Sequence, residues 1–165
     1  MSSLIAEAKA TAVLEACRRK GILLATAESC TGGLIAASLT DIGGSSDVVD
    51  RGFVTYSNEA KHEMIGVPLQ LIAAHGAVSE EVALAMAAGA LAHSHAGLAV
   101  SATGIAGPGG GTATKPVGLV WFGMALKGKE PIAARSVFED HGRASIRSAA
   151  VNFALDMVLK ALSSS

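Results

Sequence analysis

The chain has 165 residues, half of them apolar, and a formal net charge of −1. This length is typical of one domain, and the apolar share suffices for a well-buried core. Lys and Arg form no cluster, which argues against a nucleic-acid-binding surface, and no apolar run approaches the roughly 18–20 residues that span a membrane.

The two cysteines point to a reducing compartment. Cys17 falls in a predicted helix and Cys30 in a predicted turn, so the sequence carries no disulfide framework. Glu7, Lys9 and Glu15 interrupt the apolar residues of the N-terminus, which is unlike a signal peptide. We therefore expect a cytoplasmic protein.

The first half of the chain alternates between helix and strand. Periodicity and turn residues predict a helix over residues 3–20 ended by Gly21, a buried strand over 22–27, a helix from Thr31 to Thr40, a loop over 41–46, a strand within 47–56, a short helix to Ile65 capped by Ser57 or Asn58, and another over 69–74. This alternation is typical of an α/β fold.

The second half ends in a hairpin and a helix. We expect a helix from Ser79 to about His93, a strand over 97–103, an irregular glycine-rich stretch over 104–118, strands over 119–126 and 132–138 joined by a turn, a helix from Arg143 to Leu162, and a disordered tail over 163–165. Together the elements predict a single domain with a mixed, mostly parallel sheet of about five strands, covered by helices on both faces.

Three predicted strands end in polar residues. The ends are Glu28-Ser29, Tyr56-Ser57 and Thr103-Gly104. Ligands of open α/β sheets bind beyond the carboxyl ends of the parallel strands, so these residues are expected to share one rim of the sheet. That convergence predicts the position of a binding or catalytic site.

The strand end at Glu28-Ser29 lies in the stretch from Thr26 to Gly33, whose pattern predicts the end of a strand, a tight turn and the start of a helix. Small residues and free backbone N–H groups at a helix N-terminus suit a phosphate or an oxyanion. Ser29 has two readings, an N-cap of the following helix or a nucleophile. Glu28, Cys30, Thr31 and Gly32 are candidate substrate contacts around it.

Lys61 is the candidate base for that serine. Holding a lysine neutral at pH 7 costs roughly 4–5 kcal/mol, which burial or a nearby cation such as Arg143 can offset. If Lys61 is protonated, it is expected to contact a phosphate or an oxyanion instead. The simplest alternative is that Lys61 is a solvent-exposed lysine on a helix.

The other candidates carry similar alternatives. Tyr56 is expected to stack on a base, to relay a proton, or only to pack at a sheet edge. Asn58 is expected either to contact the substrate or to cap a helix. Thr103, Gly104 and the following loop supply a wall of backbone N–H groups or a flexible connection. Arg143 and Arg147 oppose the dipole of their helix, a conflict that an incoming phosphate would relieve; the alternative is two solvated arginines.

Several known motifs are missing. Gly128-Lys129 is followed by Glu130, so there is no Walker loop, and no complete G-x-G-x-x-G follows a strand. His62-Glu63 lacks the second zincin histidine because position 66 is glycine. Ala27 and Thr31 replace the glycines of a G-x-S-x-G elbow. We expect neither a metal nor a cofactor.

Five blocks of the sequence form a recognisable set: Thr26–Gly33, Arg51–Lys61, His75–Ser79, Gly104–Pro108 and Lys115–Gly118. Together they resemble the CinA C-terminal domain family, whose single-domain members are nicotinamide-nucleotide amidohydrolases of the PncC type. The resemblance covers roughly residues 5–160. It implies a three-layer α/β/α fold, a nucleotide as the small-molecule partner, no metal, and a homo-oligomer, a dimer or larger.

The resemblance also implies roles for single residues. Ser29 is similar to the family's nucleophile and Lys61 to its base, while Tyr56, Asn58, Thr103 and Arg143 are similar to pocket residues. Residues 1–162 are expected to form one amidohydrolase domain, without the larger N-terminal domain of full-length relatives. Gly109 departs from the acidic or polar residue expected there, which implies a more flexible loop.

The reaction that the resemblance implies is hydrolysis of nicotinamide mononucleotide to nicotinate mononucleotide and ammonia, in the recycling of pyridine nucleotides. Ser29 attacks the carboxamide after Lys61, directly or through Tyr56, removes its proton. Three alternatives remain open at this stage: a water nucleophile, a nucleotide-binding module without turnover, and hydrolysis of another amide or nucleotide.

Overall fold

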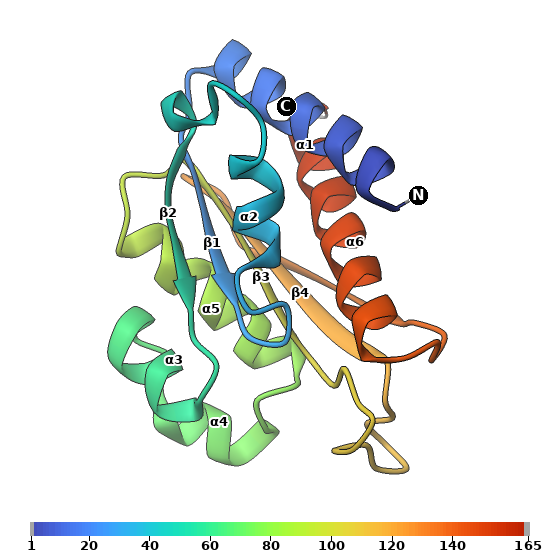
Figure 1. Cartoon of the computed structure of the whole chain (residues 1–165). Helices are drawn as coiled ribbons and strands as arrows, with labels where there is room; N and C mark the ends of the chain where they lie inside the picture. Colours follow the sequence, from blue (N-terminus) through green and yellow to red (C-terminus); the bar gives the residue numbers. More distant parts are fainter. Residues whose placement is uncertain (1, 164–165) are drawn as a thin grey trace.

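The computed structural model describes residues 2–163. In chain order the elements are α1 (Ser2–Lys20), β1 (Leu24–Glu28), α2 (Leu34–Thr40), a short 3₁₀ helix η1 (Ser45–Asp47), β2 (Val49–Val54), α3 (Asn58–Ile65), α4 (Leu69–His75), α5 (Glu80–Ala92), β3 (Leu98–Gly104), β4 (Leu119–Leu126), β5 (Ile132–Val137) and α6 (Arg143–Ser163). The predicted helices and strands are thus confirmed to within a few residues (Figure 1).

The five strands form one mixed sheet in the order β2-β1-β3-β4-β5. β1 pairs in parallel with β2 and β3, so the parallel part of the sheet is β2-β1-β3. β4 runs antiparallel to β3, and β5 antiparallel to β4. The predicted mixed sheet and its C-terminal hairpin are therefore confirmed.

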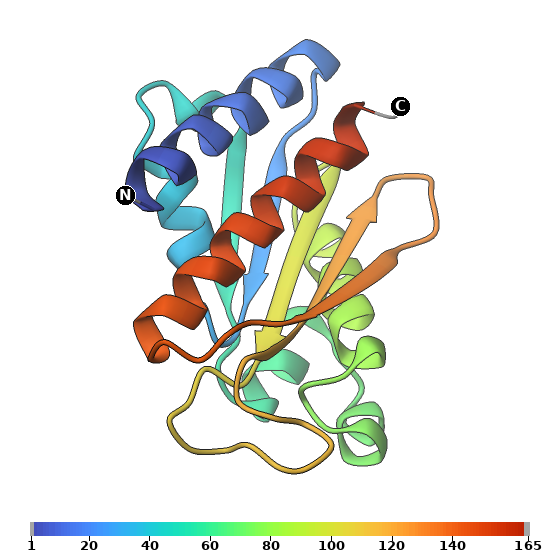
Figure 2. The ribbon, with the colours of Figure 1, turned by 90° about the vertical axis from the view of Figure 1, so that its right-hand side faces the viewer.

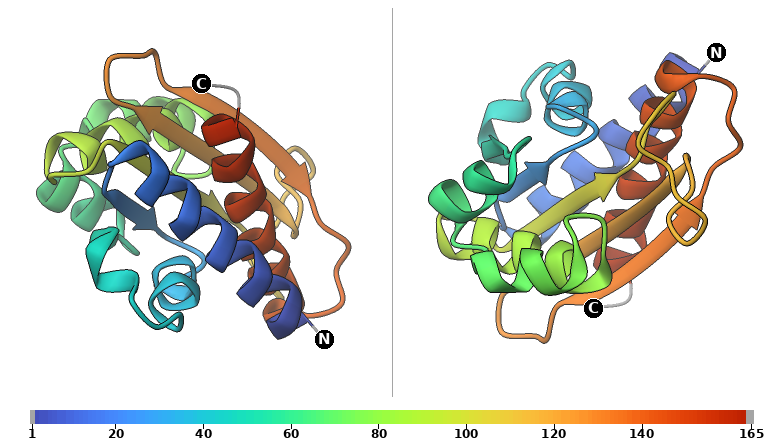
Figure 3. Two further views of the ribbon diagram at one scale, coloured as in Figure 1. Left: turned by 90° about the horizontal axis from the view of Figure 1, so that it is seen from above. Right: turned by 90° about the horizontal axis from the view of Figure 1, so that it is seen from below.

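Helices cover both faces of the sheet. α1, α2 and α6 pack together on one face, where α1 and α6 lie side by side (Figure 2). α5 packs on the other face against β1, β3 and β4, with α3 and α4 beside it, as the end-on views show (Figure 3). The expected three-layer α/β/α arrangement is confirmed.

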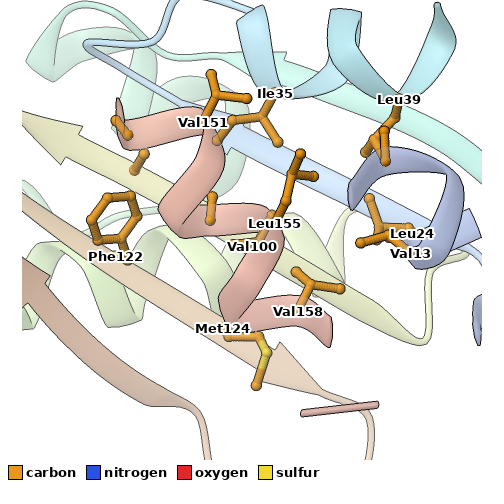
Figure 4. Close-up of a cluster of buried hydrophobic side chains, with 14 of the residues drawn as sticks. Val13, Leu24, Ile35, Leu39, Val100, Phe122, Met124, Val151, Leu155 and Val158 are labelled. Atoms are coloured by element: carbon orange, nitrogen blue, oxygen red, sulfur yellow. The ribbon is translucent and has the colours of Figure 1, made fainter. Parts of the chain in front are cut away.

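Each face of the sheet buries a different kind of core. Side chains alternate along a strand, so Leu24 and Val100 face α1, α2 and α6, where they join Phe122 and Leu155 (Figure 4). Small residues face α5 instead. On β4, a Cβ at Gly123 would collide with the backbone of Ala83 in α5, so glycine allows the close packing of helix and sheet.

The turn after β1 differs from the prediction. α2 begins at Leu34 rather than Thr31, because Gly32 and Gly33 have φ angles of 56° and 105°, in the left-handed region that ends regular structure. Residues 29–33 therefore form a tight turn between β1 and α2, closed by hydrogen bonds from the Gly32 N–H to the Ser29 carbonyl and from the Leu34 N–H to the Thr31 carbonyl.

The first and last helices end close to where the sequence predicts. α1 ends at Lys20 and Gly21 has a φ of 65°, as predicted. α6 continues through Ser163, one residue further than expected, so that serine is helical rather than part of a tail. Residues 164 and 165 of the expected tail lie outside the described residues.

Candidate active site

The carboxyl ends of β1, β2 and β3 meet at one rim of the sheet, as predicted. The turn after β1 is fixed by two backbone hydrogen bonds: the Ser29 N–H donates to the Ala102 carbonyl of β3 at 2.9 Å, and the Gly32 N–H donates to the Ser29 carbonyl at 3.0 Å. Ser29 is thereby held where β1 ends, half-buried and next to the neighbouring strand.

Glu28 anchors α2 to the sheet. Its carboxylate is 1 % exposed and accepts hydrogen bonds from the backbone N–H groups of Ile35, at 2.9 Å, and Ala36, at 3.0 Å. The N-cap of α2 is Gly33, and no side chain caps the helix from that position. Glu28 therefore satisfies the helix N-terminus, and Ser29 is not the cap of α2.

Lys61 is buried beside Ser29. It lies on α3, whose first turn is capped by the Ser57 hydroxyl accepting from the Ala60 N–H at 3.0 Å. The Lys61 side chain is 1 % exposed, and its Nζ lies 3.3 Å from Ser29 Oγ. Nζ also donates to the backbone carbonyls of Thr55, at 3.0 Å, and Tyr56, at 3.5 Å.

Burial disfavours the charged form of Lys61. Burial lowers the pKa of Lys61 below its ordinary value, and no salt bridge involves this lysine within residues 2–163. A neutral amine has two N–H groups and one lone pair. The two carbonyls take the N–H groups, which leaves the lone pair to accept the Ser29 hydroxyl proton. Arg143, considered above as a cause of such a shift, is not one; desolvation is.

Cys30 is next to Ser29 but lacks a nucleophile's character. Burial raises the pKa of its thiol to about 11, so the thiol stays protonated at neutral pH. Only the thiolate is strongly nucleophilic. Cys30 therefore forms part of the wall around Ser29, and the hydroxyl of Ser29 is the nucleophile candidate of this turn.

A cavity of about 200 Å³ opens beside the Ser29–Lys61 pair. Its lining combines residues from the three rim segments, from the segment after α4 and from the start of α6: Ser29, Cys30, Tyr56, Asn58, Lys61, Ala77, Val78, Thr103, Gly104, Ala106 and Arg143. Three of the residues expected to contact substrate are not in this lining: Glu28, Thr31 and Gly32.

The mouth of the cavity is crossed by hydrogen bonds from Arg143. Its guanidinium donates to the Gly107 carbonyl at 2.8 Å and to the Tyr56 hydroxyl at 3.0 Å. Tyr56 is 61 % exposed, so its ring face is free to stack on a ligand. The Tyr56 hydroxyl faces Arg143, whereas Lys61 contacts Ser29 directly, so proton transfer between them needs no relay through Tyr56.

The opposite wall is held by Thr103 at the end of β3. Its hydroxyl donates to the Ala77 carbonyl at 2.9 Å, which fixes the segment after α4 against the sheet. Ala77, Val78 and Ala106 were not expected from the sequence, because apolar loop residues carry no chemical signal. The only sequence indication was the resemblance of the His75–Ser79 and Gly104–Pro108 blocks.

The glycine-rich loop after β3 is fastened at several points. The Ile105 N–H donates to the Leu119 carbonyl at 2.9 Å, and the Gly118 N–H to the Ile105 carbonyl at 2.8 Å. At the far side, Lys115 Nζ donates to the His75 carbonyl at 2.7 Å, at the end of α4. The loop is therefore attached both to β4 and to the helix layer beside the cavity.

Gly109 in this loop is expected to accept a side chain with a small gain in stability. Its backbone avoids the left-handed region, and a Cβ there meets no atom within 4 Å. Gly109→Ala should raise the free energy of unfolding by about 0.5 kcal/mol, because alanine restricts the unfolded chain. Urea denaturation measures this change in the free energy of unfolding.

Gly107→Ala is the control variant, and its urea midpoint should fall. Gly107 has a φ of 77°, and a Cβ there would lie 2.6 Å from Val117. A fall for both variants would contradict the geometry of the loop.

Arg147, the second arginine that opposes the dipole of the last helix, contacts the turn after β1 and not the cavity. From the second turn of α6 its Nε donates to the Cys30 carbonyl at 3.0 Å and its Nη2 to the Thr31 carbonyl at 3.3 Å. Across residues 2–163, the backbone N–H groups of Cys30 and Thr31 donate to no oxygen. Of these two residues, only Cys30 also lines the cavity beside Ser29.

The described residues were also compared with the requirements of a membrane-spanning helix and of a metal site. Across residues 2–163, none of the helices combines the length and the apolar composition that crossing a membrane requires. In the same part of the chain, His, Cys, Asp and Glu side chains form no group of three or more that can hold a metal ion.

Known proteins resemble this chain over nearly all of its length. It is 51 % identical over 145 residues to the nicotinamide-nucleotide amidohydrolase PncC of Enterobacter agglomerans, covering 88 % of each chain. The protein of the same name from Escherichia coli strain K12 is 52 % identical, over 86 % of this chain and 85 % of the relative.

Among solved structures, the competence/damage inducible protein CihA from Agrobacterium tumefaciens superposes with a TM-score of 0.93 at 50 % identity, covering 96 % of both chains. The family model of the CinA C-terminal domain matches residues 6–162. By sequence and by fold, the chain belongs to the CinA C-terminal domain family.

Proposed function

We propose that the protein is an amidohydrolase that converts nicotinamide mononucleotide to nicotinate mononucleotide and ammonia. The observation that carries this proposal is the contact between Ser29 Oγ and the buried Nζ of Lys61 at 3.3 Å, inside a cavity at the carboxyl ends of the strands. The names of the relatives from Enterobacter agglomerans and Escherichia coli supply the substrate class.

In this mechanism Lys61 is the base and Ser29 the nucleophile. Neutral Lys61 takes the Ser29 hydroxyl proton as Oγ attacks the carboxamide carbon, and the protonated amine then gives that proton to the departing nitrogen, which leaves as ammonia. Water attacks the resulting ester and loses a proton to Lys61. Collapse of this second intermediate returns the proton from Lys61 to Ser29 Oγ, and the product acid releases its remaining proton to solvent as it becomes the carboxylate.

The oxyanion of each intermediate requires hydrogen-bond donors. The backbone N–H of Cys30 follows the nucleophile directly, belongs to a residue that lines the cavity, and has no oxygen acceptor in the described part of the chain. Donors of this kind lower the barrier by stabilising charge that develops in the transition state. We assign the oxyanion site to this turn.

The size of the cavity suggests how the nucleotide lies. At about 200 Å³ it is smaller than the roughly 300–1,000 Å³ of pockets that enclose whole drug-sized ligands. The carboxamide end would therefore be enclosed, and the ribose phosphate would extend across the mouth. Arg143 supplies a cation there, with the ring of Tyr56 and the amide of Asn58 beside it.

The wider setting is also part of the proposal. Residues 1–162 would act as one amidohydrolase domain, without a metal or cofactor, in the recycling of pyridine nucleotides. A homo-oligomer and a cytoplasmic location follow from the family resemblance and from the two unpaired cysteines.

Measuring ammonia release from nicotinamide mononucleotide, nicotinamide and NAD tests the proposed function. Release from the mononucleotide alone is the expected result. Release from another of these amides would assign a different substrate. Binding of the mononucleotide without ammonia would overturn the enzymatic assignment in favour of a nucleotide-binding module.

Arg143→Gln is expected to raise the KM for nicotinamide mononucleotide about tenfold or more, because a charge-assisted hydrogen bond contributes roughly 1.5–3 kcal/mol. The kcat should change less, since Arg143 lies at the mouth and not beside Ser29 Oγ. Steady-state kinetics measure both constants, with Arg135→Gln on β5 as a charge-matched control. An unchanged KM would remove Arg143 from the phosphate site.

A further inference from the structure

We propose that a second copy of this chain pairs in antiparallel orientation with the outer edge of β5, which joins the two sheets into one. This surface is independent of the proposed activity, and it specifies where the homo-oligomer implied by the family resemblance forms. β5 is the terminal strand of the sheet and is outermost in both end-on views (Figure 3). The backbone groups of an unpaired edge strand are a template for another strand.

Alternate residues of β5 turn their backbone N–H and C=O groups away from β4. The Phe138 N–H donates to the Gly118 carbonyl at 2.9 Å, and the antiparallel register of β4 and β5 continues from this bond. Because hydrogen-bonded pairs alternate along such a ladder, the residues bonded to β4 are Ile132, Ala134 and Ser136. The residues whose backbone groups point outward are Ala133, Arg135 and Val137. Within residues 2–163, no hydrogen bond from another segment reaches these outward groups.

The opposite edge of the sheet is better protected than the edge at β5. The edge strand β2 contains the ion pair Asp50–Arg51, at 2.9 Å. Charged side chains on an edge strand discourage pairing with another chain. The single charged residue of β5 is Arg135, whose guanidinium lies over the Trp121 ring, 5.9 Å from its centroid. The outer edge of β5 therefore carries little that would repel a second strand.

An apolar groove lies beside the same edge, between β5 and α6. Its volume is about 510 Å³, and its lining includes Ile132 and Ala134 from β5 and Phe153 and Met157 from α6. The Ile132 side chain is 52 % exposed. Exposed apolar surface next to unpaired backbone groups marks a site of protein association. A strand added to β5 would cover both features at once.

The groove is complementary to a second copy of itself. Asp156 and Lys160 of α6 both line it, four residues apart and of opposite charge. A two-fold axis perpendicular to the sheet sets the two α6 helices antiparallel on the same face, so that Lys160 of one copy approaches Asp156 of the other. Asp156 uses Oδ2 to accept from Lys9 at 2.9 Å, and its side chain is still 58 % exposed. Its other oxygen is available to a second cation.

The strand sequence selects the register in which Ala134 lies on the two-fold axis. Ala133 of each copy then exchanges two hydrogen bonds with Arg135 of the other copy, and Ile132 lies opposite Ser136. An axis at Arg135 would set two like charges directly opposite each other, which destabilises a strand pair. An axis at Ser136 would leave Ile132 exposed beyond the end of the added strand.

Cysteine cross-linking tests this register. Ala134→Cys should form a disulfide between two chains under mild oxidation, because Cα atoms of a non-hydrogen-bonded antiparallel pair are about 4.5 Å apart, within the range that a disulfide spans. Non-reducing gel electrophoresis measures the covalent dimer. Cys17 and Cys30 are buried, so the wild type should not cross-link. Ser136→Cys is the matched control, and a cross-link there with none at Ala134→Cys would overturn the register.

Sedimentation velocity at micromolar concentrations tests the interface without a cross-link. The wild type should be a dimer. Ala133→Pro removes an outward N–H and leaves the ladder to β4 intact, so it should raise the dimer Kd about tenfold or more. Lys160→Glu should raise the Kd about fivefold or more through like-charge repulsion at Asp156, whereas Arg19→Glu, at an exposed site on α1, should not. A monomeric wild type, or a dimer that both β5 and α6 variants leave unchanged, would overturn the proposal.

Ammonia release separates this proposal from the proposed function. No residue of β5 lines the cavity beside Ser29, so Ala133→Pro and Lys160→Glu should keep the wild-type kcat. A wild-type protein that forms the Ala134→Cys-sensitive dimer and releases no ammonia would refute the amidohydrolase and support the interface. An active enzyme that sediments as a monomer would refute the interface alone.

Discussion

Ser29→Ala is expected to lower kcat for ammonia release from nicotinamide mononucleotide by at least a thousandfold, because it removes the atom that forms the acyl-enzyme. The melting temperature should change by about 1 °C or less, since the Ser29 hydroxyl does not cap α2. Steady-state kinetics and thermal unfolding measure the two effects. The combination is informative, because loss of a true helix cap costs about 1 kcal/mol of stability.

Two controls frame the Ser29 experiment. Ser38→Ala on α2 removes a hydroxyl that bonds only its own helix, and should leave both activity and stability unchanged. Ser79→Ala removes the cap of α5 and should lower the melting temperature. Mass spectrometry of quenched wild-type enzyme should detect the nicotinate nucleotide as an ester on Ser29. If Ser29→Ala keeps near-wild-type turnover, water is the nucleophile and Ser29 only lines the cavity.

Lys61→Met should abolish catalysis and stabilise the fold. Loss of the base is expected to lower kcat/KM a thousandfold or more. Methionine fills a similar volume without a charge to desolvate, so the free energy of unfolding at pH 7 should rise by about 1 kcal/mol, which raises the melting temperature by roughly 2–4 °C. Kinetics and differential scanning calorimetry measure the two effects.

The pH dependence of this stabilisation has a definite sign. The pKa of Lys61 is lowered in the folded protein, so between that value and the unfolded pKa near 10.4 the unfolded chain binds a proton that the folded chain does not. Wild-type stability therefore rises with pH across this window. The advantage of Lys61→Met should be greatest below the folded pKa and shrink as pH rises through the window.

The same ionisation governs activity. Wild-type kcat/KM should rise with pH through the folded pKa of Lys61, because only the neutral amine accepts the Ser29 proton. Lys129→Met, which changes an exposed lysine of the β4–β5 turn, should alter neither profile. A Lys61→Met protein that is less stable than wild type at every pH would mean that Lys61 supports the fold as a charged hydrogen-bond donor.

Much of the fold could be predicted because its signals are local. The caps at Ser57 and Ser79 and the continuous apolar strands mark element boundaries within a few residues. The rule that parallel strands end at one rim was enough to bring Ser29, Tyr56 and Thr103 together. What it could not supply was the direction of each side chain.

Glu28 and Lys61 illustrate that limit. Glu28 stands next to Ser29 in the sequence, yet adjacent side chains of a strand point to opposite faces, and its carboxylate turns toward α2. Lys61 reads as a solvated helix residue, and its burial arises only when α3 docks beside the end of β2. Arg147 gave one weak signal, its conflict with the helix dipole, and its partners lie 116 and 117 residues earlier.

That long separation has a consequence for how the protein is made. Chains emerge from the ribosome N-terminus first, so Ser29 and Lys61 leave it well before α6. The carbonyls of Cys30 and Thr31 receive their hydrogen bonds from Arg147 only after the first turns of α6 have docked against the earlier elements. The rim that carries Ser29 is therefore completed only at the end of synthesis, when Arg143 and Arg147 join it from the last helix.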